Sequence, residues 1–84
     1  MSGRRGTGSL ERVEEEVERE VRRREADWEY IRSLPPRLRE AVKLFIETGD
    51  LRLAQRLAGM GLEDFIELLR RARVPPFVTV VYED

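Results

Sequence analysis

Two short apolar segments flank a glycine-containing turn in the run Leu53-Ala-Gln-Arg-Leu-Ala-Gly-Met-Gly-Leu-Glu-Asp-Phe65. A short helix, a turn that carries Gly and a second helix make up the helix-turn-helix motif. The small residues Ala54 and Ala58 permit close approach of a neighbouring helix, and Gly59 can adopt the positive φ that such a turn needs. The run therefore predicts a helix-turn-helix, with an ordinary helical hairpin as the alternative.

Another helix is expected directly before this run. Pro35 and Pro36 end whatever precedes them, because Pro disfavours the α region for the residue before it and suits the first turn of a new helix. The new helix is expected to run to Thr48, and Gly49 suits the position just after its end. Residues 35–74 are therefore predicted to form a unit of three short helices.

The boundaries of the next two helices follow from local signals. Asp50 can cap a helix over residues 51–58, and a further helix starts near Leu62 with Glu63 and Asp64 in its first turn, where the helix dipole favours carboxylates. The apolar residues at helical spacing are expected to face inward. They are Leu38, Ala41, Val42, Phe45, Ile46, Leu51, Leu53, Ala54, Leu57, Leu62, Phe65, Ile66, Leu69 and Ala72.

Three runs of this unit share a pattern with a known family: Arg39-Glu-Ala-Val-Lys-Leu-Phe-Ile-Glu-Thr-Gly49, Ala54-Gln-Arg-Leu-Ala-Gly-Met60 and Phe65-Ile-Glu-Leu-Leu-Arg-Arg-Ala-Arg-Val-Pro75. From Leu38 to Pro75 the chain resembles a small, uncharacterised prokaryotic family with the pattern A-x-x-L-(Y/F)-x-x-G, A-A-x-x-A-G-M, F-x-x-L-L, (I/V)-P. Its members are regarded as helix-turn-helix antitoxins and are often paired with PIN-domain ribonuclease toxins. The resemblance implies a homodimer that binds operator DNA and a PIN-domain toxin partner.

The chain departs from that family at four points. Gly49 falls one residue late, Gln55 stands where a second small residue is usual, and Gly61 stands where Ser or Thr would cap the next helix. The family also tends to begin with a short strand, whereas this chain begins with a long charged segment.

Charge gives a mixed prediction for DNA binding. Glu63, Asp64 and Glu67 lie at the start of the helix that would read base edges, where carboxylates face a phosphate-lined groove. Arginines elsewhere could contact the DNA backbone, or they could be solvated or paired with nearby Glu. The candidates for backbone contact are Arg52, Arg56, Arg70, Arg71 and Arg73.

The N-terminal segment is expected to form a disordered tail over residues 1–8 and one long amphipathic helix over residues 9–34, with Ser9 as its N-cap. Its apolar residues make a stripe only one or two residues wide per turn, which is typical of a seam against another helix. The alternative is a solvated helix with a minor docking stripe. The predicted seam residues are Leu10, Val13, Val17, Val21, Trp28 and Ile31.

The C-terminal segment, residues 75–84, contains a β-branched and aromatic run that predicts a strand. Because no second strand is predicted to supply its hydrogen-bond partners, we expect it to pair between chains. The alternative is an apolar strap packed on the helices. The strand residues are Phe77, Val78, Thr79, Val80, Val81 and Tyr82.

Composition excludes several classes of protein. The 84 residues hold 16 Lys+Arg against 17 Asp+Glu, and neither His nor Cys occurs. The usual general base, nucleophile pairs with His and thiolate or imidazole metal sites are therefore absent. We expect no enzyme activity, cofactor, metal or small-molecule substrate. No apolar run is long enough to cross a membrane and no signal peptide is evident, so a cytoplasmic location is expected.

The basic residues are all Arg apart from Lys43, and there is no Asn. This bias is typical either of a thermophile or of a GC-rich genome.

Two functional hypotheses of different class follow from these features. The first is a mainly α, non-enzymatic regulator of antitoxin type that binds DNA, a partner toxin or both. The second is a protein-interaction or assembly module with a helix-turn-helix-like fold and no DNA binding, which would act through the seam and the strand.

Overall fold

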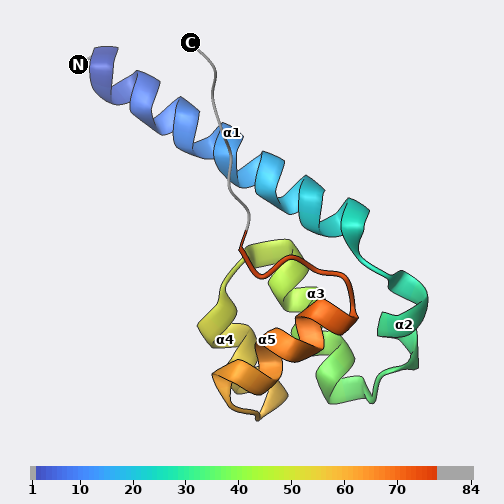
Figure 1. The fold of residues 1–84 in the computed structure, drawn as a ribbon. Coiled ribbons are helices and arrows are strands. Elements are labelled where there is room, and N and C mark those ends of the chain that lie inside the picture. Colours follow the sequence, from blue (N-terminus) through green and yellow to red (C-terminus); the bar gives the residue numbers. More distant parts are fainter. Residues whose placement is uncertain (1, 78–84) are drawn as a thin grey trace.

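The computed structural model describes residues 2–77, and for residues 2–12 it describes the backbone alone. Within this range the chain is mainly α, as predicted, with five helices and no strand. Four short helices pack into a compact unit, and the N-terminal helix extends well past them (Figure 1). The helices are α1 (Ser2–Glu25), α2 (Trp28–Ser33), α3 (Pro36–Thr48), α4 (Leu51–Ala58) and α5 (Leu62–Arg71).

The ends of α3 and α4 are set by local capping, as the sequence predicts. Pro36 occupies the first turn of α3, and Gly49 follows its end with a φ of 72°. The Gly49 amide donates to the Phe45 carbonyl oxygen at 2.8 Å. The Asp50 carboxylate then accepts the Leu53 amide at 3.0 Å and caps α4. These contacts satisfy backbone groups that a helix end otherwise leaves without partners.

A tight turn joins α4 to α5. Gly59 ends α4 with a φ of 72°, the left-handed conformation that Gly adopts at least cost. Its amide donates to the Gln55 carbonyl oxygen at 3.0 Å. Gly61 precedes α5 with extended backbone and provides no side-chain cap, as the departure from Ser or Thr at this position predicts.

The core lies between α3, α4 and α5, with α2 closing one side. Most of the predicted core is confirmed, and Leu68 is buried in addition. Leu53, Leu57 and Leu62 were predicted to be buried, which is wrong: they are 47%, 41% and 44% exposed. The inner face of α4 carries Ala54 and Ala58, which let α4 pack closely on α3 and leave the leucines on its outer side. Buried apolar residues are Ala26, Ile31, Ala41, Val42, Phe45, Ile46, Ala54, Ala58, Phe65, Leu68, Leu69, Ala72 and Val74.

The N-terminal segment differs from the prediction at both ends. The tail expected over residues 1–8 is wrong for residues 2–8, because helix α1 begins at Ser2 and Ser9 lies inside it. Starting a helix is costly, whereas each residue added to an existing helix also adds a hydrogen bond. The helix after Ser9 can therefore extend through residues 2–8, although most of these residues have low helix propensity.

The expected helix over residues 9–34 is also divided. It ends at Glu25, and Asp27 caps the separate helix α2 through the Tyr30 amide at 3.1 Å. The Asp27 amide donates to the Ala72 carbonyl oxygen at 2.7 Å, which ties the break to the end of α5. The turn of the chain at this break brings Ile31 into the core, where it is 1% exposed.

The C-terminal end of α5 is closed by a motif that has Arg73, rather than Gly, at its left-handed position. Arg73 has a φ of 59°, its amide donates to Arg70, and the Val74 amide donates to the Leu69 carbonyl oxygen at 2.8 Å. This pattern is a Schellman motif, which usually places Gly in the left-handed position. The predicted strand begins at Phe77, which is exposed, and its remaining residues, Val78, Thr79, Val80, Val81 and Tyr82, lie outside the described residues.

Candidate functional site

Helix α1 is attached to the C-terminal end of α3 through arginines. The Nε–H of Arg19 donates to the Glu47 carbonyl oxygen at 3.0 Å, and that of Arg22 donates to the Ile46 carbonyl oxygen at 2.9 Å. Arg23 binds the Glu47 carboxylate with its Nε at 3.1 Å and Nη2 at 2.6 Å. Cations are favoured here, because the last carbonyls of a helix are unpaired and carry partial negative charge.

Arg22 is the most buried of these arginines, with 6% of its surface exposed. Its Cζ lies 5.5 Å from the centroid of the Phe45 ring, a cation–π contact. Burial lowers the pKa of Arg22, and the charges of Glu18 and Glu47 oppose that effect. Gly49 leaves room for the guanidinium, because a Cβ there would lie 3.2 Å from Arg22 Nη2.

Arg37 caps the end of α4 as Arg19 and Arg22 cap the end of α3. The Arg37 Nε–H donates to the Leu57 carbonyl oxygen at 2.8 Å. A Cβ at Gly59 would lie 3.1 Å from Arg37 Nη2, so glycine again makes room for the guanidinium. Sequence reasoning missed both arginine caps. The glycines mark where a helix ends, but nothing in the sequence shows which distant arginine reaches that end.

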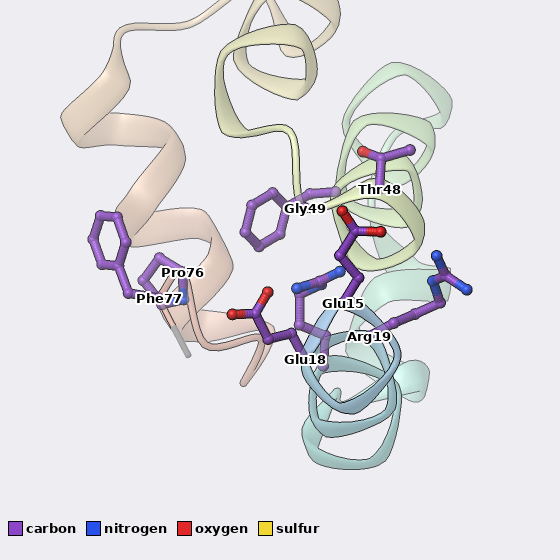
Figure 2. A pocket seen from close by; sticks show the side chains of 9 residues that line it. Glu15, Glu18, Arg19, Thr48, Gly49, Pro76 and Phe77 are labelled. Carbon is purple, nitrogen blue, oxygen red and sulfur yellow. The ribbon is translucent and has the colours of Figure 1, made fainter. Parts of the chain in front are cut away.

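A cavity of about 400 Å³ lies between α1, the C-terminal end of α3 and the segment at Pro76 and Phe77. In the close view, Glu15 and Glu18 come from α1, with Glu15 pointing toward the Gly49 turn and Glu18 toward Pro76, and Phe77 lies on the far side from Thr48 (Figure 2). The wall mixes two carboxylates with two guanidinium groups, so it offers no excess charge of either sign to a ligand.

The predicted seam is not one surface. Val13 and Val17 are 49% and 41% exposed on α1, whereas Val21 is half-buried beside Val74 and Pro75. Trp28 belongs to α2 and its indole Nε1–H donates to the Arg23 carbonyl oxygen at 3.0 Å.

Ile31 is buried in the core and cannot contribute to an exposed seam. Leu10 lies in the part of α1 for which only the backbone is described. The seam prediction is wrong as a single surface because the predicted helix is divided into α1 and α2. Residues after the break no longer continue the face of α1. Among the seam residues of α1 whose side chains are described, Val13 and Val17 are the exposed pair, hereafter the valine stripe, while Trp28 on α2 is 38% exposed.

Glutamates border the valine stripe on both sides. With about 100° of rotation per residue, Glu14 and Glu18 fall on one side of the stripe and Glu16 and Glu20 on the other. Glu16 and Glu20 are exposed, and Glu14 and Glu18 are half-buried. Arg19 and Arg22 fall on the opposite side of α1, which is the side that contacts α3, whereas Arg23 falls beside Glu16 and Arg24 falls in line with the stripe.

The structure does not gather the five candidate DNA-contacting arginines into one surface. Arg71 lies 3.8 Å from the Glu67 carboxylate and borders a groove beside α2. Arg70 and Arg73 border a different groove, with Val21 of α1. Arg52 and Arg56 lie on α4. The exposed start of α5 carries Glu63 and Asp64.

Helix α4 presents an apolar and basic surface that sequence reasoning missed, because its leucines were assigned to the core. Leu53 and Leu57 are successive exposed residues at i,i+4 spacing, and Arg52 and Arg56 form a parallel exposed row beside them. We call these four residues the leucine–arginine face.

The described residues contain no group of three or more acidic side chains placed to hold a metal ion. No helix within residues 2–77 is both long and apolar enough to cross a membrane. Comparison of the chain with protein-family profiles, curated proteins and solved structures finds no match.

Proposed function

We propose that this protein is a protein-interaction module that presents the valine stripe of α1 to a partner. The observation that carries the proposal is the exposure of Val13 and Val17, at 49% and 41%, on a helix whose opposite side is attached to α3. Exposed apolar side chains on a projecting helix are typical of a helix that enters the groove of a partner.

The attachment of α1 supports this proposal. Three arginines hold α1 to the end of α3, so its direction relative to the helical unit is fixed before any partner binds. A pre-oriented helix loses less conformational entropy on binding than a flexible segment does. The glutamates around the stripe favour a partner whose apolar surface is bordered by basic side chains.

Site-specific cross-linking tests the proposal directly. Val17 is replaced by a photoreactive phenylalanine derivative in cells that produce the protein, and Glu29, which is exposed on α2, receives the same replacement as a matched control. We expect illumination to give adducts of discrete mass from position 17 and none from position 29. Equal adducts from both positions, or none from position 17, would overturn the proposal.

The second candidate is a DNA-binding regulator of antitoxin type. Its support is the pair of short helices α4 and α5, joined by a glycine turn, with Ala54 and Ala58 on the packed side of α4. Arg52 and Arg56 would contact the DNA backbone, and the protein would act as a homodimer with a PIN-domain toxin. A neighbouring reading frame for such a toxin would favour this candidate.

DNA titration separates this candidate from the first. Labelled DNA from upstream of the reading frame is titrated with the protein at low and moderate salt, with scrambled DNA alongside. A regulator prefers its own upstream DNA, and its affinity falls with salt and on Arg52→Ala and Arg56→Ala. Absence of binding at low salt would exclude DNA binding by the isolated protein.

A further inference from the structure

Two exposed surfaces of this chain complement each other in shape and charge. The valine stripe presents Val13 and Val17 at i,i+4 spacing, and the leucine–arginine face presents Leu53 and Leu57 at the same spacing. Residues four apart lie on the same side of a helix, one turn from each other, so each surface is a short apolar ridge of equal length. One ridge is bordered by glutamates and the other by arginines.

The two surfaces of one molecule do not cover each other. Figure 1 shows α4 on the side of the helical unit that lies away from α1. Both ridges accordingly remain exposed, with Leu53 at 47% and Val13 at 49%. The complementarity can be satisfied only between molecules.

Pairing of two valine stripes with each other is unfavourable. Glu14, Glu16, Glu18 and Glu20 border the stripe on both sides, so any parallel or antiparallel pairing of two α1 helices brings Glu rows together. Like charges at the borders of a helix pair select against that pairing. Arg19, Arg22 and Arg23 do not offset this repulsion, because they are held against α3, and the exposed Arg24 lies one turn beyond Glu20.

We infer that the valine stripe of one copy docks on the leucine–arginine face of a second copy. This inference rests on the proposed function, since it names the partner of the same stripe. In this pairing Arg52 and Arg56 face the exposed row of Glu16 and Glu20 rather than the half-buried row of Glu14 and Glu18. Each copy carries one stripe and one face, so two contacts related by a two-fold axis close a dimer.

A charge-swap experiment tests the pairing. One variant carries Glu16→Arg and Glu20→Arg, and the other carries Arg52→Glu and Arg56→Glu. All four positions are exposed, so both variants are expected to keep the far-UV circular dichroism of the native protein. Sedimentation velocity over a concentration series, at low and at moderate salt, reports the association of each variant and of their equimolar mixture.

We expect the native protein to dimerise in a salt-sensitive way. Each variant alone should dimerise at least about tenfold more weakly, because the reversal places like charges across both contacts. The mixture should recover the native association, since in a mixed dimer the altered α1 of one variant meets the altered α4 of the other and the second contact keeps its native charges. Loss of association in one variant only, or a mixture no better than its components, would overturn the pairing.

The cross-linking at Val17 separates failure of this inference from failure of the proposed function. A native protein that stays monomeric, together with adducts of position 17 to another protein, overturns the second copy as occupant but keeps the interaction module. Adducts between two copies that map to residues outside α4 likewise overturn the docking on α4 but keep the interaction module. Absence of adducts at position 17 overturns both.

Discussion

The guanidinium of Arg22 stacks on the ring of Phe45, with its Cζ 5.5 Å from the ring centroid. Arg22 comes from the helix that projects from the molecule, and Phe45 is a core residue near the end of α3. The same guanidinium donates to the Ile46 carbonyl oxygen at 2.9 Å. One side chain therefore couples the direction of α1, which presents the valine stripe, to the packing of the core.

Replacement of Arg22 is expected to destabilise the fold. Arg22→Ala removes a largely buried side chain and leaves the Ile46 carbonyl without its charged donor, a loss of about 1.5–3 kcal/mol. Urea unfolding followed by circular dichroism measures it. Arg24→Ala, at an exposed position on the same helix, is the matched control and should stay within about 0.5 kcal/mol of the native protein. Equal losses for the two variants would show that the Arg22 contacts contribute no stability.

The two glycines of the α4–α5 turn should respond oppositely to the same substitution. Gly59→Ser places a Cβ at a φ of 72° and 3.1 Å from Arg37 Nη2, so it should lower the free energy of unfolding by about 1–2 kcal/mol. At Gly61, an extended N-cap position, the added Cβ lies 3.9 Å from Asp64 Oδ2, which is an ordinary contact. The serine hydroxyl there can accept an amide of the first turn of α5, which should raise the stability by about 0.5–1 kcal/mol.

Thermal unfolding of both serine variants checks this pair. A lower melting temperature for Gly59→Ser and a higher one for Gly61→Ser are expected. A stabilised Gly59→Ser variant would mean that the turn does not require left-handed backbone at that position.

The parts of the fold that depend on neighbouring residues could be predicted from the sequence. The bounds of α3 and α4 were expected where they are found, because Pro36, Gly49 and Asp50 act on the backbone within one turn. The break after Glu25 could not be predicted in this way. It is tied to the Asp27 amide bond with the Ala72 carbonyl, a contact between residues far apart in the sequence.

The candidate site was predicted only in part for the same reason. Val13 and Val17 were named from their spacing, and both are exposed. The sequence places Leu53 and Leu57 in the core, because the sequence of a short amphipathic helix does not reveal how closely a neighbouring helix packs against it. Two alanines on the inner face let α3 pack closely on α4, and the leucines remain outside.

Replacement of a buried and of an exposed leucine by alanine tests whether Leu57 lies outside the core. Leu69 is fully buried in α5, so Leu69→Ala should cost about 2–5 kcal/mol of unfolding free energy through lost burial and the cavity it leaves. Leu57→Ala, measured at a concentration where the protein is monomeric, should cost under about 1 kcal/mol, because its side chain is 41% exposed. Chemical denaturation of the two variants gives the comparison. Similar costs would place Leu57 in the core.

The contact between Arg23 and Glu47 should make stability depend on acidic pH. The hydrogen bond from Arg23 holds the pKa of Glu47 below its ordinary value of 4.5, helped by the charges of Arg23, Arg19 and Arg22. The folded protein therefore keeps this carboxylate charged at pH values where the unfolded chain protonates it. The resulting stabilisation is fully present above pH 4.5 and is lost as the pH falls through the lower pKa of the folded state.

Both side chains are about half exposed, so the effect should be small. A double-mutant cycle with Arg23→Gln and Glu47→Gln, measured by urea unfolding, should give a positive coupling at pH 7 that decreases as the pH is lowered below 4.5. A coupling that does not change with pH would show that the charge of Glu47 does not stabilise the attachment of α1.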